Sequence, residues 1–131
     1  MIVDSSALVA VAFAEPGYLR FVDALSRTEA RIGAPTAVET GVVLAARLGP
    51  TGGLLASSLI ERFAIELLPF DERHWAEAVV AFQRFGRGKH PAGLNFGDCL
   101  SYAVAKVAGD DLLYKGSDFA QTDIRSALTG T

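Results

Sequence analysis

The sequence predicts an α/β fold of three layers, in which a short, mainly parallel central sheet lies between two layers of helices. Short apolar runs alternate along the chain with longer segments that have the periodicity of amphipathic helices. Strands that alternate with helices are joined by crossover connections, which give a parallel sheet covered on both faces. The chain has 131 residues, a common size for one domain with its own core. We therefore expect residues 1–131 to form a single domain.

The start of the chain predicts two strands and two helices. Residues 1–3 are apolar and form the first strand, and residues 5–14, rich in Ala, Val and Leu, form the first helix. A Glu-Pro-Gly turn at residues 15–17 ends this helix. Residues 18–26 carry an apolar stripe that is typical of a second helix, and residues 31–34 form a short second strand.

The middle of the chain predicts two more helices and a third strand. Residues 36–48 form a helix that ends at the pair Gly49-Pro50, because proline cannot continue a helix beyond its first turn. Residues 52–63 are amphipathic and form the next helix. The apolar run at residues 64–70 is expected to be a third parallel strand.

The last third of the chain predicts two long helices and a final strand. Residues 71–85 form a helix that an aspartate caps, and residues 95–108 form another that ends at a glycine. Between them, residues 84–93 form a basic loop that contains Gly and Pro. Residues 111–115 form a short strand, so strands and helices alternate to the end of the chain.

The composition favours a cytoplasmic protein whose surface is partly covered by a partner. Half of the residues are hydrophobic, the mean hydropathy is +0.30 and only 21% are charged, which predicts an apolar surface for a partner. Charged residues interrupt every apolar run before the ~18 residues that a membrane span requires. No basic segment precedes the first strand, as a secretory signal would have. The net charge of −3 disfavours binding of nucleic acid through overall attraction.

Four carboxylates lie far apart in the chain, yet each stands where an apolar segment gives way to a helix or where a helix starts. They are Asp4, Glu39, Asp98 and Asp118. In folds with a parallel sheet, ligands bind beyond the carboxyl ends of the strands. We therefore expect these side chains to converge at one edge of the sheet.

Each of these acids also has a structural explanation. The segments at 36–39 and 95–98 have the spacing of a capping box, in which an acid at the third helical position bonds back to the cap residue. Asp4 and Asp118 stand where an N-cap is expected. A cap requires only a short polar side chain, however, and Ser, Thr or Asn serves as well as a carboxylate. The recurrence of acids favours a further role.

A cluster of carboxylates predicts a bound cation. Two like charges about 4 Å apart repel by about 4 kcal/mol at an effective dielectric constant near 20. A divalent cation removes this cost, and a site made of oxygen ligands alone selects hard ions such as Mg²⁺ or Mn²⁺. Such ions bridge to phosphate oxygens and lower the pKa of a bound water, which indicates hydrolysis of phosphodiesters.

The four acids belong to longer motifs. These read MIVDSSAL at residues 1–8, PTAVE at 35–39, NFGDCL at 95–100 and KGSDFAQTDI at 115–124. In this order they resemble the motifs of PIN-domain ribonucleases, in particular the VapC toxins of bacterial toxin–antitoxin pairs, and the resemblance covers nearly the whole chain. It implies a PIN fold and a Mg²⁺-dependent endoribonuclease, with Mn²⁺ as a substitute, that cleaves RNA. It also implies a homodimer that a cognate VapB-type antitoxin neutralises.

The resemblance assigns roles to particular residues. It implies that the four acids are both catalytic residues and metal ligands, with Asp4 and Asp98 as the principal ligands. Asp123 would be a more peripheral acid. Ser6 stands where a small hydroxyl often supports the first acid, and Ser117 stands where many relatives carry Asn.

Other features relate to RNA and to the antitoxin. Arg84, Arg87 and Lys89 make the densest basic stretch, and they could position RNA phosphates or simply face solvent. Phe96 could stack on an unpaired base, but its helical spacing favours a place in the core. The apolar helices between residues 5 and 63 are expected to form a groove for an antitoxin helix.

Two other functions remain open. A receiver-type signalling domain also has a parallel sheet and an acidic Mg²⁺ pocket, but it needs paired acids after the first strand, where this chain has Asp4-Ser5-Ser6. A non-catalytic PIN-like interaction module is the second alternative. Retention of all four acids disfavours that module.

Overall fold

The computed structural model describes residues 1–128, and these form the predicted α/β architecture around a parallel sheet. The sheet has the strand order β3-β2-β1-β4, and all three pairings are parallel. Because the strands are parallel, their carboxyl ends share one edge of the sheet. Asp4 stands at this edge, directly after β1. The strands are β1 (Ile2–Val3), β2 (Arg31–Gly33), β3 (Glu66–Leu68) and β4 (Leu112–Leu113).

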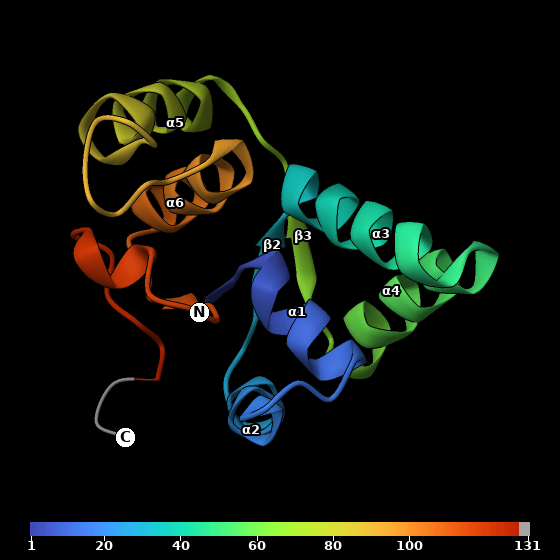
Figure 1. The fold of residues 1–131 in the computed structure, drawn as a ribbon. Helices are drawn as coiled ribbons and strands as arrows, with labels where there is room; N and C mark the ends of the chain where they lie inside the picture. The colour runs from blue at the N-terminus through green and yellow to red at the C-terminus, as the bar shows by residue number, and fades with distance from the viewer. Residues whose placement is uncertain (129–131) are drawn as a thin grey trace.

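Helices cover both faces of the sheet, so the fold has three layers. α5 and α6 pack against each other on one side, and α1 to α4 lie on the other side (Figure 1). This confirms the layered architecture that the sequence predicts. The helices are α1 (Ser5–Ala12), α2 (Tyr18–Arg27), α3 (Ala34–Leu48), α4 (Pro50–Arg62), α5 (Glu72–Phe85) and α6 (Phe96–Ala108), followed by a 3₁₀ turn η1 (Phe119–Gln121).

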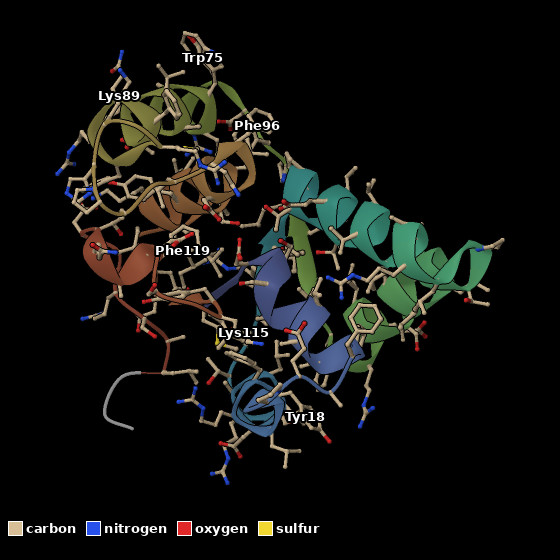
Figure 2. The ribbon with its side chains drawn as sticks, viewed as in Figure 1. Tyr18, Trp75, Lys89, Phe96, Lys115 and Phe119 are labelled. Atoms are coloured by element: carbon tan, nitrogen blue, oxygen red, sulfur yellow. The ribbon has the colours of Figure 1, made fainter. Side chains whose placement is uncertain are left out.

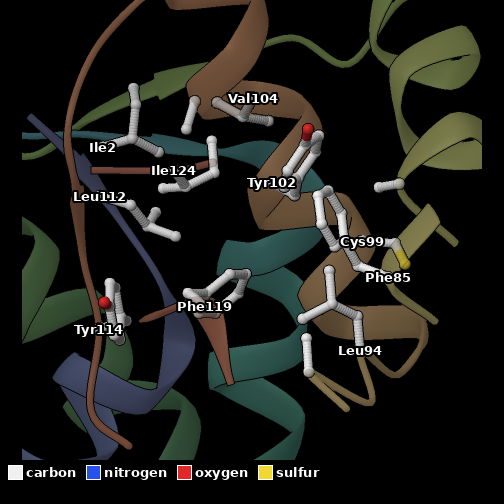
Figure 3. Packing of buried hydrophobic residues seen from close by; sticks show 13 residues of the cluster. Ile2, Phe85, Leu94, Cys99, Tyr102, Val104, Leu112, Tyr114, Phe119 and Ile124 are labelled. Atoms are coloured by element: carbon white, nitrogen blue, oxygen red, sulfur yellow. The ribbon is translucent and has the colours of Figure 1, made fainter. Parts of the chain in front are cut away.

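Successive residues of β1 pack into different core clusters on opposite faces of the sheet. Ile2 and Leu112 belong to the cluster under α5 and α6, which Figure 3 shows with Tyr102 and Phe85. The next residue along β1, Val3, belongs instead to the cluster under α1 and α2. Neighbouring side chains on a strand point to opposite faces, so even two-residue strands fix both helical layers relative to the sheet.

Gly33 allows α6 to lie close to the sheet. A Cβ atom at this position would approach Val104 Cγ2 to 2.7 Å, which is closer than carbon atoms pack. Helix α6 carries the candidate ligand Asp98 at its amino-terminal end. The small residue at the end of β2 thus helps to set where this acid stands relative to the strand ends.

Several predicted boundaries differ from the structure for a local reason. The predicted helices at 36–48 and 52–63 begin earlier, at Ala34 and Pro50, because proline lacks only an N–H that the first helical turn does not use. The predicted strand at 64–70 is shorter, since Ala64 and Ile65 still bond to carbonyls of α4. Residues 71–85 and 95–108 match α5 and α6 within one residue.

The prediction that Phe96 faces the core is wrong. Its side chain is 79% exposed at the first position of α6, whereas the next residue, Gly97, is buried. Within residues 1–128, no helix has the length and apolar character that crossing a membrane requires.

Candidate functional site

The four predicted acids come from four different segments of the chain. Asp4 directly follows β1 and caps α1, as predicted, with Oδ2 accepting the N–H of Ser6 at 3.1 Å. Glu39 lies in the second turn of α3, Asp98 in the first turn of α6, and Asp118 immediately before η1. Asp4 is buried, Glu39 and Asp98 are half-buried, and Asp118 is exposed.

Electrostatics show that these carboxylates lie within reach of one another. Burial raises the pKa of Asp98 to about 6, against a hydrogen bond from the Asn95 backbone that lowers it. The charges of three further acids also raise this pKa, namely Asp4, Asp118 and Glu39. Burial likewise raises the pKa of Glu39, with a further contribution from the Asp4 charge. Burial and the neighbouring charges together therefore make Asp98 and Glu39 harder to ionise.

Hydroxyl groups hold the Asp4 carboxylate on both of its oxygens. Ser6 Oγ donates to Oδ2 at 2.5 Å, and Ser101 Oγ donates to Oδ1 at 2.5 Å. Ser6 Oγ also accepts the backbone N–H of Lys115, which follows β4. The resemblance implies the Ser6 contact, but sequence reasoning missed Ser101. The available signal was a polar residue one helical turn after Asp98, within an otherwise apolar segment.

The predicted capping role of Glu39 is wrong. Because α3 begins at Ala34, Glu39 lies too far along the helix to cap it. Its Oε1 accepts instead a hydrogen bond of 3.0 Å from Ser5 Oγ. A Cβ atom on Gly97 would collide with the Glu39 carboxylate, so the glycine beside Asp98 makes room for this side chain. Sequence reasoning missed both of these contacts.

Asp98 and Asp118 differ in how firmly they are held. The predicted capping box is present: Asp98 Oδ2 accepts the Asn95 N–H at 3.1 Å, and Asn95 Oδ1 accepts the Asp98 N–H at 2.8 Å. Asp118 makes no side-chain capping bond to η1, so its predicted role as an N-cap is wrong. Ser117 and Asp118 are both exposed, next to the buried anchor Phe119.

Asp123 does not join the other acids. One of its carboxylate oxygens accepts from the Tyr102 hydroxyl at 2.7 Å, and the other accepts from Lys106 Nζ at 2.9 Å. Arg84 lies 3.7 Å from the same carboxylate. Burial raises the pKa of Asp123, but the hydrogen bonds from Tyr102 and Lys106 and the Lys106 charge lower it, and the net shift is downward. In this structure Asp123 ties the segment after η1 to α6.

The predicted basic residues have different environments. Arg84 is engaged with Asp123, whereas Arg87 is exposed and the Lys89 ammonium lies 6.0 Å from the centre of the Phe82 ring. Figure 2 shows Lys89 well away from Phe96, which begins the helix that carries Asp98. Lys115 stands three residues before Asp118 in the chain. Its ammonium, however, pairs with the Glu15 carboxylate at 2.8 Å.

The donor set fits a hard divalent cation. Within residues 1–128, no three His, Cys, Asp or Glu side chains are arranged as a ready-made metal site. Mg²⁺ does not require such a cage, because it usually keeps several waters and takes one or two carboxylates together with substrate phosphates. The gathered groups offer carboxylate oxygens, and their raised pKa values are what an uncompensated acidic cluster produces.

An apolar cavity lies between α5 and α6, outside the acidic cluster. It has a volume of about 630 Å³. Trp75 and Phe96, which are 64% and 79% exposed, contribute to its walls, and Figure 2 labels both on the outer side of the two helices. Exposed aromatic groups of this size are typical of a surface that a partner covers.

Comparison with known proteins places the chain in a family. The family model for the PIN domain matches residues 1–125. Two similar proteins of Mycobacterium tuberculosis are Ribonuclease VapC28, 42% identical over 98% of this chain and 98% of its own length, and Ribonuclease VapC30, 40% identical over 95% of each chain.

A solved structure shows the same fold. The crystal structure of VapC20 of Mycobacterium tuberculosis, described as a Sarcin-Ricin loop cleaving toxin, has a TM-score of 0.73 at 17% identity and covers 95% of this chain and 98% of its own. The family match over most of the chain and the identity to VapC proteins over their full length agree with this fold. The chain therefore belongs to the PIN-domain family and, within it, to the VapC ribonucleases.

Proposed function

We propose that this protein is a metal-dependent endoribonuclease toxin that hydrolyses RNA phosphodiester bonds. The observation that carries the proposal is the pKa of Asp98, which burial and three neighbouring acids raise to about 6. Mutually repelling carboxylates at the ends of parallel strands are costly to keep unless a cation balances them. The names of the VapC relatives, which are called ribonucleases, support RNA as the substrate.

The four acids would have different roles in cation binding and in orienting the attacking water. Asp4 and Asp98 would hold the cation, because both lie at helix starts beside the strand ends. Glu39 and Asp118 would complete the acidic site and orient the attacking water. Bound Mg²⁺, or Mn²⁺ in its place, would supply charge stabilisation at the phosphate and a more acidic water. The exposed cations Arg87 and Lys89 are candidates for contacts to RNA phosphates.

Two partners complete the proposal. The exposed Trp75 and Phe96 around the α5–α6 cavity support a homodimer formed through this face. Exposed apolar residues on α2 to α4, such as Leu19, Val42 and Leu54, support an antitoxin that lies across these helices. The non-catalytic alternative has no observation in its favour, since all four acids are present and three of them act on Asp98.

The first prediction removes one carboxylate while keeping its helix cap. Asp98→Asn should reduce RNA cleavage at least about a hundredfold, because a principal ligand is lost, while the amide oxygen can still accept the Asn95 N–H. Cleavage of a structured RNA in Mg²⁺ measures the effect. Asp23→Asn, which removes an exposed acid on α2, is the matched control. Wild-type cleavage by Asp98→Asn would refute the proposal.

The second prediction concerns pH. The pKa of Asp98 is about 6 in the fold and about 3.9 when unfolded, so the folded state holds this proton more tightly. Without metal, the Asp98 charge therefore costs no stability below about pH 4 and a growing amount as pH rises to 6. The melting temperature of Asp98→Asn should exceed that of the wild type above pH 6 but not at pH 4. Saturating Mg²⁺ should abolish the difference.

A difference in melting temperature that stays constant between pH 4 and pH 7 would contradict this electrostatic explanation. The test uses metal-free protein first and then the same samples with Mg²⁺.

The third prediction separates the two proposed surfaces. Trp75→Ser should raise the dimer dissociation constant at least about tenfold, because the variant loses an aromatic side chain that the dimer would bury, and should leave antitoxin binding intact. Leu54→Ser, which is also an exposed apolar residue, should weaken antitoxin binding and keep the dimer. Analytical ultracentrifugation and titration with the antitoxin measure both. The opposite pattern would assign the α5–α6 face to the antitoxin and the face with Leu54 to the dimer. Wild-type dimerisation of Trp75→Ser would exclude the α5–α6 face as the dimer interface.

A further inference from the structure

Two buried hydroxyls connect the elements that carry three of the acids. Ser101 lies one turn after Asp98 on α6, is 1% exposed, and donates from Oγ to Asp4 Oδ1. Thr36, also 1% exposed, lies one turn before Glu39 on α3, and its Oγ1 is 3.3 Å from Ser101 Oγ. These hydrogen bonds thus link three parts of the fold, namely the end of β1, α3 and α6.

The direction of these hydrogen bonds follows from the number of protons. A hydroxyl carries one proton, and an ionised carboxylate only accepts. Ser101 gives its proton to Asp4, so the bond between the two hydroxyls must be donated by Thr36. Thr36 therefore donates to Ser101, and Ser101 donates to Asp4, in a chain of two hydrogen bonds that ends on the carboxylate.

Counting acceptor positions shows what the donors leave free. A carboxylate has about four lone-pair positions, two on each oxygen. Asp4 Oδ2 accepts the backbone N–H and the hydroxyl of Ser6, which uses both of its positions. Among residues 1–128, Asp4 Oδ1 accepts only from Ser101. One position remains, and it is on Oδ1.

The Ser101 contact is not a by-product of helix formation. A serine inside a helix commonly bonds to the carbonyl of its own preceding turn, as Thr40 does to the Thr36 carbonyl at 2.9 Å. Ser101 instead reaches a residue 97 positions away in the chain. Its hydroxyl donates to a buried acid of the candidate site.

We propose that Ser101 and Thr36 are positioning residues, which hold Asp4 so that it presents a single oxygen, Oδ1, to the cation. The part of this inference that concerns the cation rests on the proposed function. The part that concerns the orientation of Asp4 rests on the hydrogen bonds alone. Thr36 lies within the PTAVE motif and Ser101 directly follows the NFGDCL motif, and neither would contact RNA, because both are buried.

Two variants and a matched control test the proposal. Ser101→Ala removes the donor to Oδ1, and Thr36→Val removes the second hydroxyl with little change of volume. Thr40→Val makes the same substitution four residues away in α3, at a buried hydroxyl that bonds only within its helix. Electron paramagnetic resonance of free Mn²⁺ gives the metal dissociation constant of each protein. The three-bond coupling between Asp4 N and Cγ reports the Asp4 rotamer in metal-free protein.

We expect Ser101→Ala to raise the Mn²⁺ dissociation constant about tenfold, as loss of a supporting partner does at other metal sites. Thr36→Val should raise it less, and Thr40→Val should not change it. In metal-free Ser101→Ala, the Asp4 coupling should shift to an average over rotamers, because the neighbouring acids repel a carboxylate that has lost a donor.

A wild-type coupling in Ser101→Ala, or Mn²⁺ binding that Thr36→Val and Thr40→Val weaken equally, would overturn the positioning role. If wild-type protein binds no Mn²⁺ while the coupling still changes in Ser101→Ala, the proposed function fails and the orientation of Asp4 by Ser101 stands. If Ser101→Ala does not fold, the comparison of Thr36→Val with Thr40→Val decides the question.

Discussion

Repulsion among carboxylates that the fold gathers at one edge of the sheet is the constraint on which the site depends. The carboxyl ends of parallel strands share that edge, and Asp4 follows the central strand β1 directly. Asp98 and Glu39 approach from α6 and α3, and their pKa values are raised. Such a cluster is unfavourable on its own. The proposed cation would balance these charges, so the same arrangement that costs stability in the metal-free protein would provide affinity for metal.

The core and the small residues keep this arrangement in place. Alternation along β1 and β4 buries Ile2 under one helical layer and Val3 under the other, which fixes both layers to the sheet. Gly33 lets α6 approach β2, and Gly97 leaves room for the Glu39 carboxylate. Donors from Ser6, Ser101 and Ser5 then satisfy the carboxylates that burial has removed from water. Packing brings the acids together, and hydrogen bonds set their orientation.

Much of the fold could be predicted from sequence because its signals are local. Hydrophobic periodicity gave the order of strands and helices, and the cap chemistry of Asp4 and of Asn95 with Asp98 gave two helix starts. The remaining features depend on contacts between distant segments. Periodicity placed Phe96 in the core, but its side chain is exposed at the first position of α6.

The roles of Glu39 and Ser101 were hidden for the same reason. A capping box for Glu39 required α3 to begin three residues later than it does. The partner of Ser101 is 97 residues away, a separation that no local pattern encodes.

The measurement that tests the central claim most directly is an NMR pH titration of the Asp98 side-chain carboxyl, with and without Mg²⁺. We expect a pKa near 6 in metal-free protein that falls when Mg²⁺ is added or when Asp4 is replaced by Asn. A pKa at the ordinary value of about 3.9, or one that Mg²⁺ leaves unchanged, would contradict it.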